Sequence, residues 1–578
     1  MSRFLCFMKR MAQWLIGENK EIPQTLSLSL HPLVLKLLLS RGLETEEEMK
    51  KFMVPNYETD SNDPFLFDDM EKVVARIRQA RDRKEVTAIF GDYDADGITA
   101  SVIIKETLDV LGIESFVYIP DKHVEGYGIN SAAVDIFKEK NVSLIITVDC
   151  GITSISEIDK ANSLGIDVII TDHHHIPENL PKAFAVINPH AHGSRYPFKD
   201  LAGVGVAFKV VQAIYQRLIS DKIEQTKWML DLVAIGTIAD CVPLVGENRL
   251  FVRYGLVVLS KTKRVGLKEL FKVGRIVVEE NVIPDTKKVS FYIAPRINAA
   301  GRINHANLAY NLIRENNIAL ARGFALELEA NNTQRQKMTE KLADEVKVLA
   351  QNSFKDKKFI FAIDKHFPIG VVGLVAGKIA QQFNKPTGIF QKNEDISKGS
   401  FRSIPQINII ELIGECKELL EKFGGHSQAA GVSLKNDNLE KFYEKMDSLI
   451  NKKLEGVDLA EEIKIDLEAS VKEIDFNLAS ELEKLQPFGE GNREPVFIMR
   501  NLAVKEKKIV GNGNKHIKLF LAASDGTPKI FEAISFNGYD KFLHVAPGNI
   551  VDIICNIQKD EWNGNEKIQL MLIDLKVI

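Results

Sequence analysis

Between residues 86 and 189, short apolar runs alternate with segments whose apolar residues recur at helical spacing. The apolar runs have the length of strands and lie at 86–90, 114–119, 142–148, 166–170 and 183–187. Because parallel strands need a crossover between them, usually a helix, this alternation is typical of a parallel sheet with helices on both faces. The region is therefore predicted to be an α/β domain with a doubly wound parallel sheet.

Three acidic residues follow the first of these runs at alternate positions, as Asp92, Asp94 and Asp96. In open α/β sheets, ligands bind at the edge where the strands end. Carboxylates this close together repel one another and stay ionised where a cation or basic groups neutralise them. A divalent metal site is the favoured interpretation, and a solvated acidic turn is the alternative.

Four further metal-capable side chains follow apolar segments, namely Asp149, His173, His174 and Asp240. If the strands are parallel neighbours, these side chains lie at the same edge as the first three. Each has an ordinary alternative, such as a helix cap or a surface histidine, but their coincidence favours a metal centre. A mixture of carboxylates and imidazoles suits manganese or magnesium better than structural zinc, which favours thiolates.

The length and composition set broad limits. A chain of 578 residues is too long for one core, and at roughly 150 residues each it predicts about three or four domains. The formal net charge of −4 argues against an evenly basic protein that coats DNA, without excluding a local basic groove. The five cysteines show no CxxC spacing, and no segment has the pattern of a signal peptide or a membrane span. A cytoplasmic protein without a membrane partner is expected.

The rest of the chain divides into segments of different character. Residues 1–65 are expected to form an N-terminal helical appendage, and the first α/β domain is predicted to occupy 66–320. A long, charged and periodic stretch at 321–356 predicts a connecting helix, followed by a smaller α/β domain at 357–450. Short strands separated by Gly, Asn and Asp turns in 451–578 predict a β-barrel of the OB type.

Three motifs of the first domain resemble the successive signatures of the DHH phosphoesterase superfamily: GDYDADG at 91–97, VDCGIT at 148–153 and DHH at 172–174. Further motifs make the chain similar to the bacterial RecJ family within it. They are LAGVGVAFK at 201–209, GTIAD at 236–240, PRINAAGR at 295–302, GSFRS at 399–403, FGGHSQAAG at 423–431 and PFGEGN at 487–492. The resemblance covers nearly all of the chain past residue 65.

This resemblance implies a DHH domain, a DHH-associated (DHHA1) domain and an OB domain, in that order. It implies a single-stranded-DNA-specific 5′-to-3′ exonuclease that releases 5′-mononucleotides in DNA repair and recombination. One alternative is a DHH phosphodiesterase of short oligonucleotides or cyclic dinucleotides. The other is a DNA-binding relative that has lost its metals and is not an enzyme.

The resemblance also implies a role for each candidate residue at the metal centre. Two divalent ions, Mn²⁺ or Mg²⁺, would be bridged by Asp149, with Asp94 on one ion. Asp96, His173 and Asp240 would bind the other ion, and Asp92 would bind directly or through water. His174 would donate a hydrogen bond to the phosphate. Hydrolysis would then proceed by a two-metal mechanism without a covalent intermediate.

Other residues resemble the family's contacts to DNA. Ser400, Arg402 and Ser403 resemble a phosphate-binding loop in which Arg402 clamps a 5′-phosphate. His426 lies in a glycine-rich loop that can approach phosphate, with a helix terminus as the alternative. Arg296 and Arg302 are interpreted as contacts to backbone phosphate, or alternatively as buried salt-bridge partners. Arg335 is expected to be solvated.

Two positions depart from the family pattern. Phe90 stands where many relatives have histidine, and Lys122 stands where arginine is frequent. Lysine keeps the positive charge but loses the planar fork of arginine, so Lys122 predicts a looser preference for a 5′-phosphate. The implied partners are single-stranded DNA, a single-strand-binding protein and a helicase, and the chain is expected to be a monomer.

Overall fold

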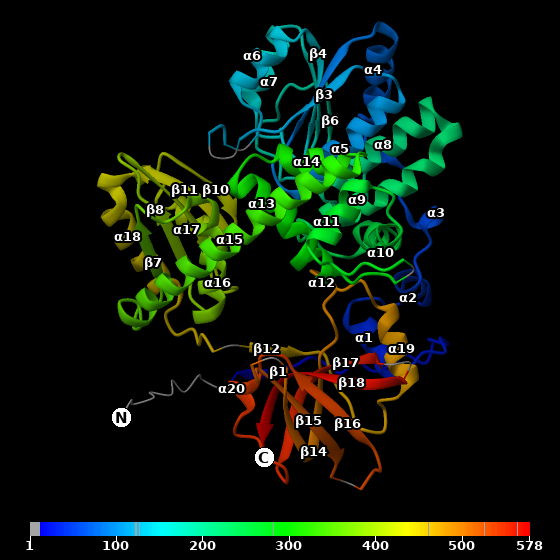
Figure 1. Cartoon of the computed structure of the whole chain (residues 1–578), viewed down its shortest axis with the longest axis vertical. Coiled ribbons are helices and arrows are strands. Elements are labelled where there is room, and N and C mark those ends of the chain that lie inside the picture. Colours follow the sequence, from blue (N-terminus) through cyan, green and yellow to red (C-terminus); the bar gives the residue numbers. More distant parts are fainter. Residues whose placement is uncertain are drawn as a thin grey trace.

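The computed structural model describes residues 12–121, 124–126, 128–280, 282–460, 462–511, 513–524, 526–562 and 565–578. Figure 1 shows an α/β domain at the top, a long helix leading to a second α/β domain at the left, and a β-barrel at the bottom. Among the described residues, none of the helices combines the length and the apolar character that a bilayer crossing requires. The predicted fold class is confirmed.

The first α/β domain is built on a five-stranded sheet in the order β3-β2-β4-β5-β6. Every neighbouring pair in this sheet is parallel. The strands are β2 (Val86–Gly91), β3 (Ser115–Tyr118), β4 (Val142–Val148), β5 (Asp167–Thr171) and β6 (Ala185–Ile187). The helices around the sheet are α4 (Met70–Arg83), α5 (Ala95–Val110), α6 (Ser131–Glu139), α7 (Ile155–Ser163) and α8 (Gly203–Leu218).

Successive side chains of these strands enter two different cores. Ile89 and Ile146 pack in the core that contains α4, α5 and α8. Their neighbours Phe90 and Ile145 pack in the core that contains α6 and α7. Both faces of the sheet are therefore buried, which explains why its strands are continuously apolar rather than alternating.

The register of the sheet aligns the residues that follow its strands. Gly91 pairs with Val148, and Val148 pairs with Thr171. The next residue of each strand, Asp92, Asp149 or Asp172, therefore lies at the same edge of the sheet.

A helical region continues from the first domain to the second. Its elements are η2 (Ser220–Met229), α9 (Leu230–Ala239), α10 (Gly246–Ser260), α11 (Val265–Val273), α12 (Thr286–Lys288), the π-helix η3 (Val289–Ile293), α13 (Ala294–Ile303), α14 (Asn307–Arg314) and α15 (Ile318–Asn352). The expected connecting helix is α15, which has 35 residues. It packs against α11 and α13 of the first domain and against α16 of the second.

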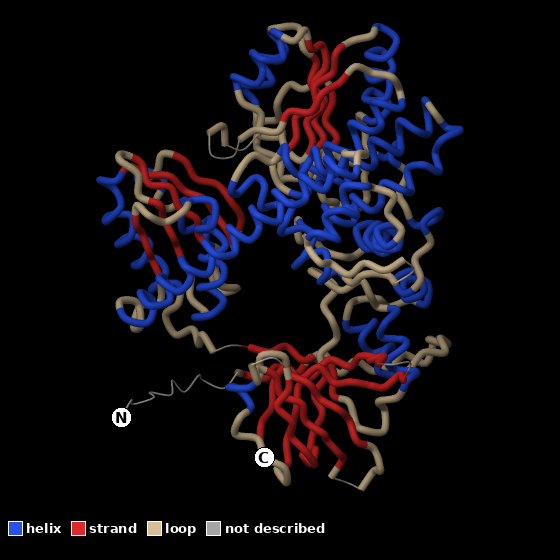
Figure 2. Tube along the Cα trace, in the orientation of Figure 1, coloured by secondary structure: helices blue, strands red, loops and turns tan. Residues whose placement is uncertain are grey.

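The second α/β domain has a mixed sheet in the order β10-β11-β9-β8-β7. Its strands are β7 (Ile360–Asp364), β8 (Thr387–Gln391), β9 (Ile396–Arg402), β10 (Lys422–His426) and β11 (Ala429–Lys435). Its helices are α16 (Ile369–Phe383), α17 (Ile409–Gly414), η4 (Lys417–Leu419), η5 (Asn436–Asn438) and α18 (Leu439–Lys453). Figure 2 shows this sheet standing apart from the sheets of the first domain and of the barrel.

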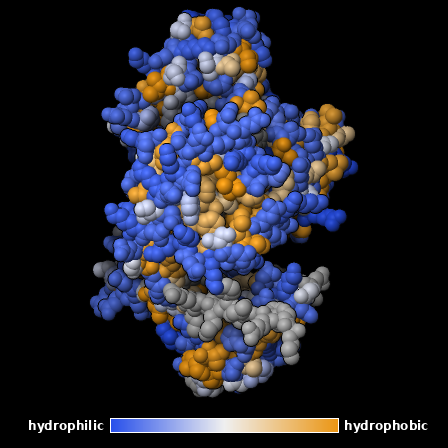
Figure 3. Space-filling view, turned by 90° about the vertical axis from the view of Figure 1, so that its left-hand side faces the viewer, coloured by the Kyte–Doolittle hydropathy of each residue, from blue (hydrophilic) through white to orange (hydrophobic). Residues whose placement is uncertain are grey.

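The C-terminal barrel closes because β14 pairs with both β15 and β17. Its elements are β13 (Leu467–Glu468), α19 (Phe476–Lys484), β14 (Phe497–Val510), β15 (His516–Ala523), β16 (Ile530–Ser535), α20 (Tyr539–Phe542), β17 (Ile550–Trp562) and β18 (Asn565–Val577). Seen from the side of the second domain, the molecular surface is largely hydrophilic and narrows above the barrel (Figure 3).

The N-terminal segment differs from the expected helical appendage. It contains β1 (Gln13–Ile16), α1 (Pro32–Ser40), α2 (Glu46–Met53), α3 (Tyr57–Asp60) and η1 (Pro64–Leu66). Strand β1 pairs in parallel with β12 (Glu462–Ile465), and α1 and α2 share a core with the barrel. The helices of this segment agree with the expected helical appendage, but β1 does not, because it is stabilised by a partner strand far along the chain that the local sequence does not reveal.

Candidate functional site

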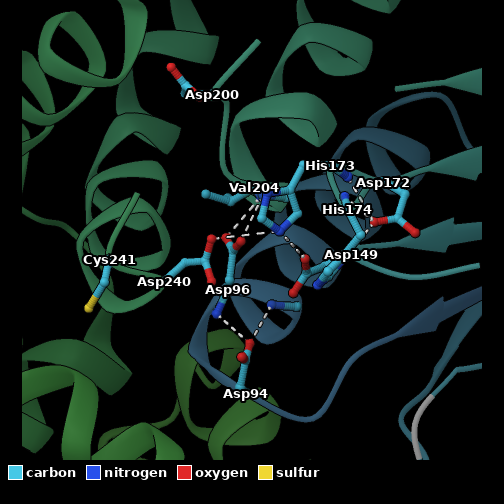
Figure 4. A network of polar contacts seen from close by, with 12 residues as sticks. Asp94, Asp96, Asp149, Asp172, His173, His174, Asp200, Val204, Asp240 and Cys241 are labelled. Atoms are coloured by element: carbon cyan, nitrogen blue, oxygen red, sulfur yellow. Dashed lines mark hydrogen bonds and ion pairs between the residues drawn. The ribbon is translucent and has the colours of Figure 1, made fainter. Parts of the chain in front are cut away.

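Seven side chains with metal-binding atoms meet at the edge where β2, β4 and β5 end. Figure 4 shows Asp94, Asp96, Asp149, His173, His174 and Asp240 of this group. Among the described residues, they form three overlapping groups in which the candidate ligand atoms lie within 4.8 Å of one another. The groups are Asp92, Asp94 and Asp149; Asp96, His173 and Asp240; and Asp149, His173 and His174. The structure thus brings together all the residues that the sequence predicted for the metal centre.

Asp149 lies at the centre of this arrangement, since it belongs to two of the three groups. Its Oδ1 is 3.2 Å from Nε2 of His173, and the same Nε2 is 3.6 Å from Oδ2 of Asp240. The backbone of Asp149 has a φ of 61°, which is uncommon for a residue other than glycine and is typical of functional sites.

Two glycines leave room for these carboxylates. A Cβ atom added to Gly203 would lie 2.4 Å from Oδ1 of Asp149, and one added to Gly236 would lie 2.7 Å from Oδ1 of Asp96. Both distances are far below van der Waals contact. Both glycines lie within motifs of the sequence, but their role could not be predicted because the close approach exists only in three dimensions.

Helix N-termini fix the orientation of two of the acids. Asp94 caps α5, where Oδ1 accepts hydrogen bonds from the backbone N–H groups of Asp96 and Gly97 at 2.9 and 3.1 Å. Asp96 accepts bonds from Gly203 N and Val204 N at the start of α8, at 2.7 and 2.9 Å. This leaves Oδ2 of Asp94 and a second lone pair on each oxygen of Asp96 for a metal ion.

The loop that carries Asp94 is also held from α13. Asn298 Oδ1 accepts a hydrogen bond from Ala95 N at 2.7 Å. Asn298 therefore ties the helical region to the metal loop, a function that its place between two arginines in the sequence did not indicate.

Asp172 is a buried residue of the site for which no role was predicted from the sequence. Its Oδ1 accepts hydrogen bonds from His173 N and His174 N and lies 2.7 Å from Nδ1 of His174, while Oδ2 accepts a bond from Ile152 N at 3.0 Å. Burial opposes ionisation, but the contacts with His174 hold the pKa of Asp172 below its usual value. Burial likewise disfavours the charged form of His174, yet Asp172 raises the pKa of His174 to about 9. Asp172 thus orients the imidazole of His174 and favours its charged, donating form.

The remaining acids repel one another in a buried setting. Burial and the charge of Asp94 raise the pKa of Asp96 to about 7, and burial and Asp96 raise that of Asp240 to about 9. Burial and neighbouring carboxylates also raise the pKa of Asp149. A bound dication reverses these shifts by neutralising the carboxylates.

The donor set fits manganese or magnesium. Burial and His174 lower the pKa of His173 to about 4, so its imidazole is neutral and able to ligate. The sulfur of Cys241 points away from the carboxylates (Figure 4), and among the described residues the metal-capable groups contain no thiol. Carboxylate oxygens with an imidazole nitrogen match the preference of Mn²⁺ rather than that of structural Zn²⁺.

The second domain presents its predicted phosphate ligands on β9 and β10. Ser400 and Arg402 lie on β9, and Arg402 Nη1 donates to Ser400 Oγ at 3.0 Å. His426 ends β10, and its ring centroid lies 6.2 Å from that of His175, close to the metal centre. Ser403 follows β9, where its hydroxyl donates to Ile407 O at 2.8 Å and holds the following turn.

The arginines of α13 differ from each other. Arg296 is 7% exposed and forms a bidentate ion pair with Glu329 on α15, at 2.5 and 3.1 Å. Its assignment as a phosphate contact is therefore corrected to the alternative, a buried salt-bridge partner. Burial lowers the pKa of Arg302, and the charge of the nearby Asp94 partly opposes this lowering. Lys122 lies outside the described residues.

Sequence comparisons match three domain families along the chain. The DHH family, N-terminal domain, matches residues 86–237, the DHHA1 domain matches 356–452, and the RecJ OB domain matches 465–574.

Whole proteins match as well. The single-stranded-DNA-specific exonuclease RecJ of Bacillus subtilis (strain 168) is 37% identical over 563 residues, which are 97% of this chain and 70% of that protein. The protein of the same name from Haemophilus influenzae is 30% identical over 578 residues, covering 96% of this chain and 98% of that protein. The crystal structure of RecJ from Thermus thermophilus in complex with Mn²⁺ matches with a TM-score of 0.83 at 27% identity, covering 98% of this chain and 80% of that one. The chain therefore belongs to the RecJ family of the DHH superfamily.

Proposed function

We propose that the protein is a metal-dependent exonuclease that hydrolyses single-stranded DNA from the 5′ end and releases 5′-mononucleotides. The observation that carries this proposal is the group of five aspartates and two histidines at one sheet edge. His426, a phosphate-binding candidate of the second domain, lies beside this edge, with its ring centroid 6.2 Å from that of His175. The B. subtilis and H. influenzae relatives are named single-stranded-DNA-specific exonucleases, and the T. thermophilus relative has been crystallised with Mn²⁺ and with Mg²⁺.

Each residue has a place in the proposed chemistry. Two divalent ions, when bound, supply an activated water and neutralise charge on the phosphate oxygens. Asp92, Asp94 and Asp149 would hold one ion, and Asp96, His173 and Asp240 would complete the binding of the other. His174, held through Nδ1 by Asp172, donates a hydrogen bond to the phosphate and compensates its growing negative charge.

A phosphodiesterase of short oligonucleotides or cyclic dinucleotides is the second candidate, since the same ligand set would serve it. The closed barrel favours the longer substrate, because OB folds bind extended single strands along a groove. The complete set of acidic and imidazole ligands opposes the non-catalytic alternative.

Digestion of single strands labelled at either end, with Mn²⁺ present, tests the proposal. A 5′-to-3′ exonuclease turns the 5′ label into mononucleotide at the earliest times and leaves a ladder from the 3′ label. A matched duplex and a dinucleotide serve as controls. Faster cleavage of the dinucleotide than of a long strand would instead support the second candidate, and digestion from the 3′ end would overturn the proposed polarity.

Partners are proposed from the family resemblance. An enzyme restricted to single strands needs another protein to open the duplex, so a helicase is the expected supplier of substrate. A single-strand-binding protein is the expected competitor or recruiter on that substrate. Passing a cell extract over the tagged protein, with nuclease added to remove bridging DNA, tests whether the helicase and the single-strand-binding protein bind. Analytical sedimentation tests the expected monomer.

A further inference from the structure

The connecting helix α15 carries an arginine with few partners. Arg335 is half-buried, and its Nη2 donates to Oδ1 of Asn332 at 2.9 Å. Its Nε is buried and makes no hydrogen bond to any part of the chain that the structure describes. Nor does Arg335 form an ion pair with a carboxylate among those residues. Arg335 is therefore only partly solvated, whereas the sequence predicted a solvated residue.

The surroundings of Arg335 are positively charged. Burial lowers its pKa, and the charges of Arg302 and Arg296 lower it further. Arg296 forms an ion pair with Glu329, and the charge of Arg302 on α13 acts on Arg335 more strongly than that of Arg296 does. Burial and Arg302 also lower the pKa of Arg402 on β9. Three arginines from α13, α15 and β9 thus place positive charge between the first and the second α/β domain.

A second polar group on the same helix lacks a partner. Asn331 is 8% exposed, and its buried Nδ2 makes no hydrogen bond within the described part of the chain. Residues four apart lie on the same face of a helix, so Asn331 and Arg335 are neighbours. Buried donors without acceptors destabilise a fold, and buried cations without an anion do so more strongly. A ligand rich in acceptors and negative charge would satisfy both of these donors.

We propose that Arg335, with Asn331 beside it, binds a phosphate of the DNA strand at the junction of α13, α15 and β9. This inference rests on the proposed function. It adds a contact on the connecting helix to the DNA contacts proposed for the two α/β domains. The phosphate is either the terminal 5′-phosphate or an internucleotide one. Arg335 positions the strand and takes no part in breaking the bond.

The test measures strand binding without hydrolysis. A fluorescent single strand is titrated with protein in Ca²⁺ at several salt concentrations, and its integrity is checked afterwards. Arg335→Gln is expected to weaken binding about ten-fold. It should also reduce the slope of log affinity against log salt by about 0.7, the value for one phosphate contact on a single strand. Lys337→Gln removes an exposed charge from the same helix and should leave the slope unchanged.

Two further arms identify the phosphate and exclude a structural effect. In a series of strands, each carries one neutral methylphosphonate at a different position. The strand with the substitution at the contacted phosphate should bind the wild type more weakly than the other strands do, and Arg335→Gln should bind all of them equally. Strands with a 5′-phosphate or a 5′-hydroxyl tell whether the position is terminal. Arg335→Lys should restore the slope, because lysine keeps the charge. Since Arg335→Gln removes a cation from a cationic cluster, its Tm should not fall.

The outcomes separate this inference from the proposed function. If the wild type binds DNA and Arg335→Gln shows the same salt slope and the same methylphosphonate profile as the wild type, the inference is overturned and the proposed function is not. A lowered Tm with an unchanged slope would show a structural arginine and would also overturn it. Wild-type protein that binds no strand at all would overturn the proposed function together with the inference.

Discussion

Nδ1 of His174 lies 2.7 Å from Oδ1 of Asp172, and Asp172 is fully buried. This pair orients the imidazole and favours its charged form, so we expect the two residues to act as one unit. We expect Asp172→Asn and His174→Gln each to lower kcat on the order of a hundredfold, because general acid or donor groups contribute roughly 10²–10⁴. The double variant should be no worse than His174→Gln alone, measured by steady-state kinetics with Mn²⁺. Losses that multiply would contradict a shared function.

Asp149→Ala should abolish hydrolysis and leave strand binding largely intact, since it removes a metal ligand but none of the residues proposed to contact DNA. Without metal, the variant should have a higher Tm than the wild type at neutral pH, because it loses an acid whose ionisation is opposed in the folded state by burial and by neighbouring carboxylates. Asp159→Ala, an exposed aspartate on α7, is the matched control and should change neither property. Substantial Mn²⁺-dependent activity of Asp149→Ala would refute the assignment.

Gly203→Ala should reduce the affinity for Mn²⁺ and the rate together, because the added methyl group displaces the Asp149 carboxylate. Gly205→Ala lies on the same helix and meets only a leucine side chain, whose nearest atom is at 3.2 Å, so it is the comparison variant. Metal binding is measured by calorimetry on both. An equal effect of the two substitutions would point to helix α8 in general rather than to the metal centre.

Arg402→Ala should weaken binding of strands with a 5′-phosphate more than of strands with a 5′-hydroxyl. A bidentate arginine contact is worth about 1.5–3 kcal/mol, which is about ten- to hundredfold in affinity. Competition binding with the two kinds of end measures the difference. Identical losses for both ends would remove Arg402 from the 5′-phosphate site.

Lys209→Met should destabilise the first domain, since Lys209 Nζ and Glu247 Oε1 form a buried ion pair at 2.6 Å. Breaking such a pair leaves a buried charge and typically costs about 3–5 kcal/mol. The double variant Lys209→Met/Glu247→Gln should recover part of the loss in thermal unfolding. No recovery would mean that the lysine acts mainly through its hydrogen bonds to Ser61 and Asn62.

The strands of the first domain and the edge that carries Asp92 and Asp149 could be predicted, because strand period and parallel pairing are local or general rules. The role of Asp172 could not, because a buried acceptor of four hydrogen bonds looks, in sequence, like one more residue of a polar loop. The sequence predicts a phosphate contact for Arg296, but Arg296 pairs with Glu329. The sequence could not distinguish the two, because a guanidinium binds either a phosphate or a carboxylate and Glu329 is 33 residues away. The pairing of β1 with β12 depends on a contact across most of the chain.

Helix α15 sets both the distance and the rotation between the two α/β domains. Its 35 residues extend about 50 Å at roughly 1.5 Å each. One inserted residue would turn everything beyond it by about 100° and swing Arg402 out of line with the metal-binding edge. Natural length changes in this helix should therefore come in steps near seven residues, which restore the phase, and single-residue insertions made by mutagenesis should uncouple the lobes without unfolding either.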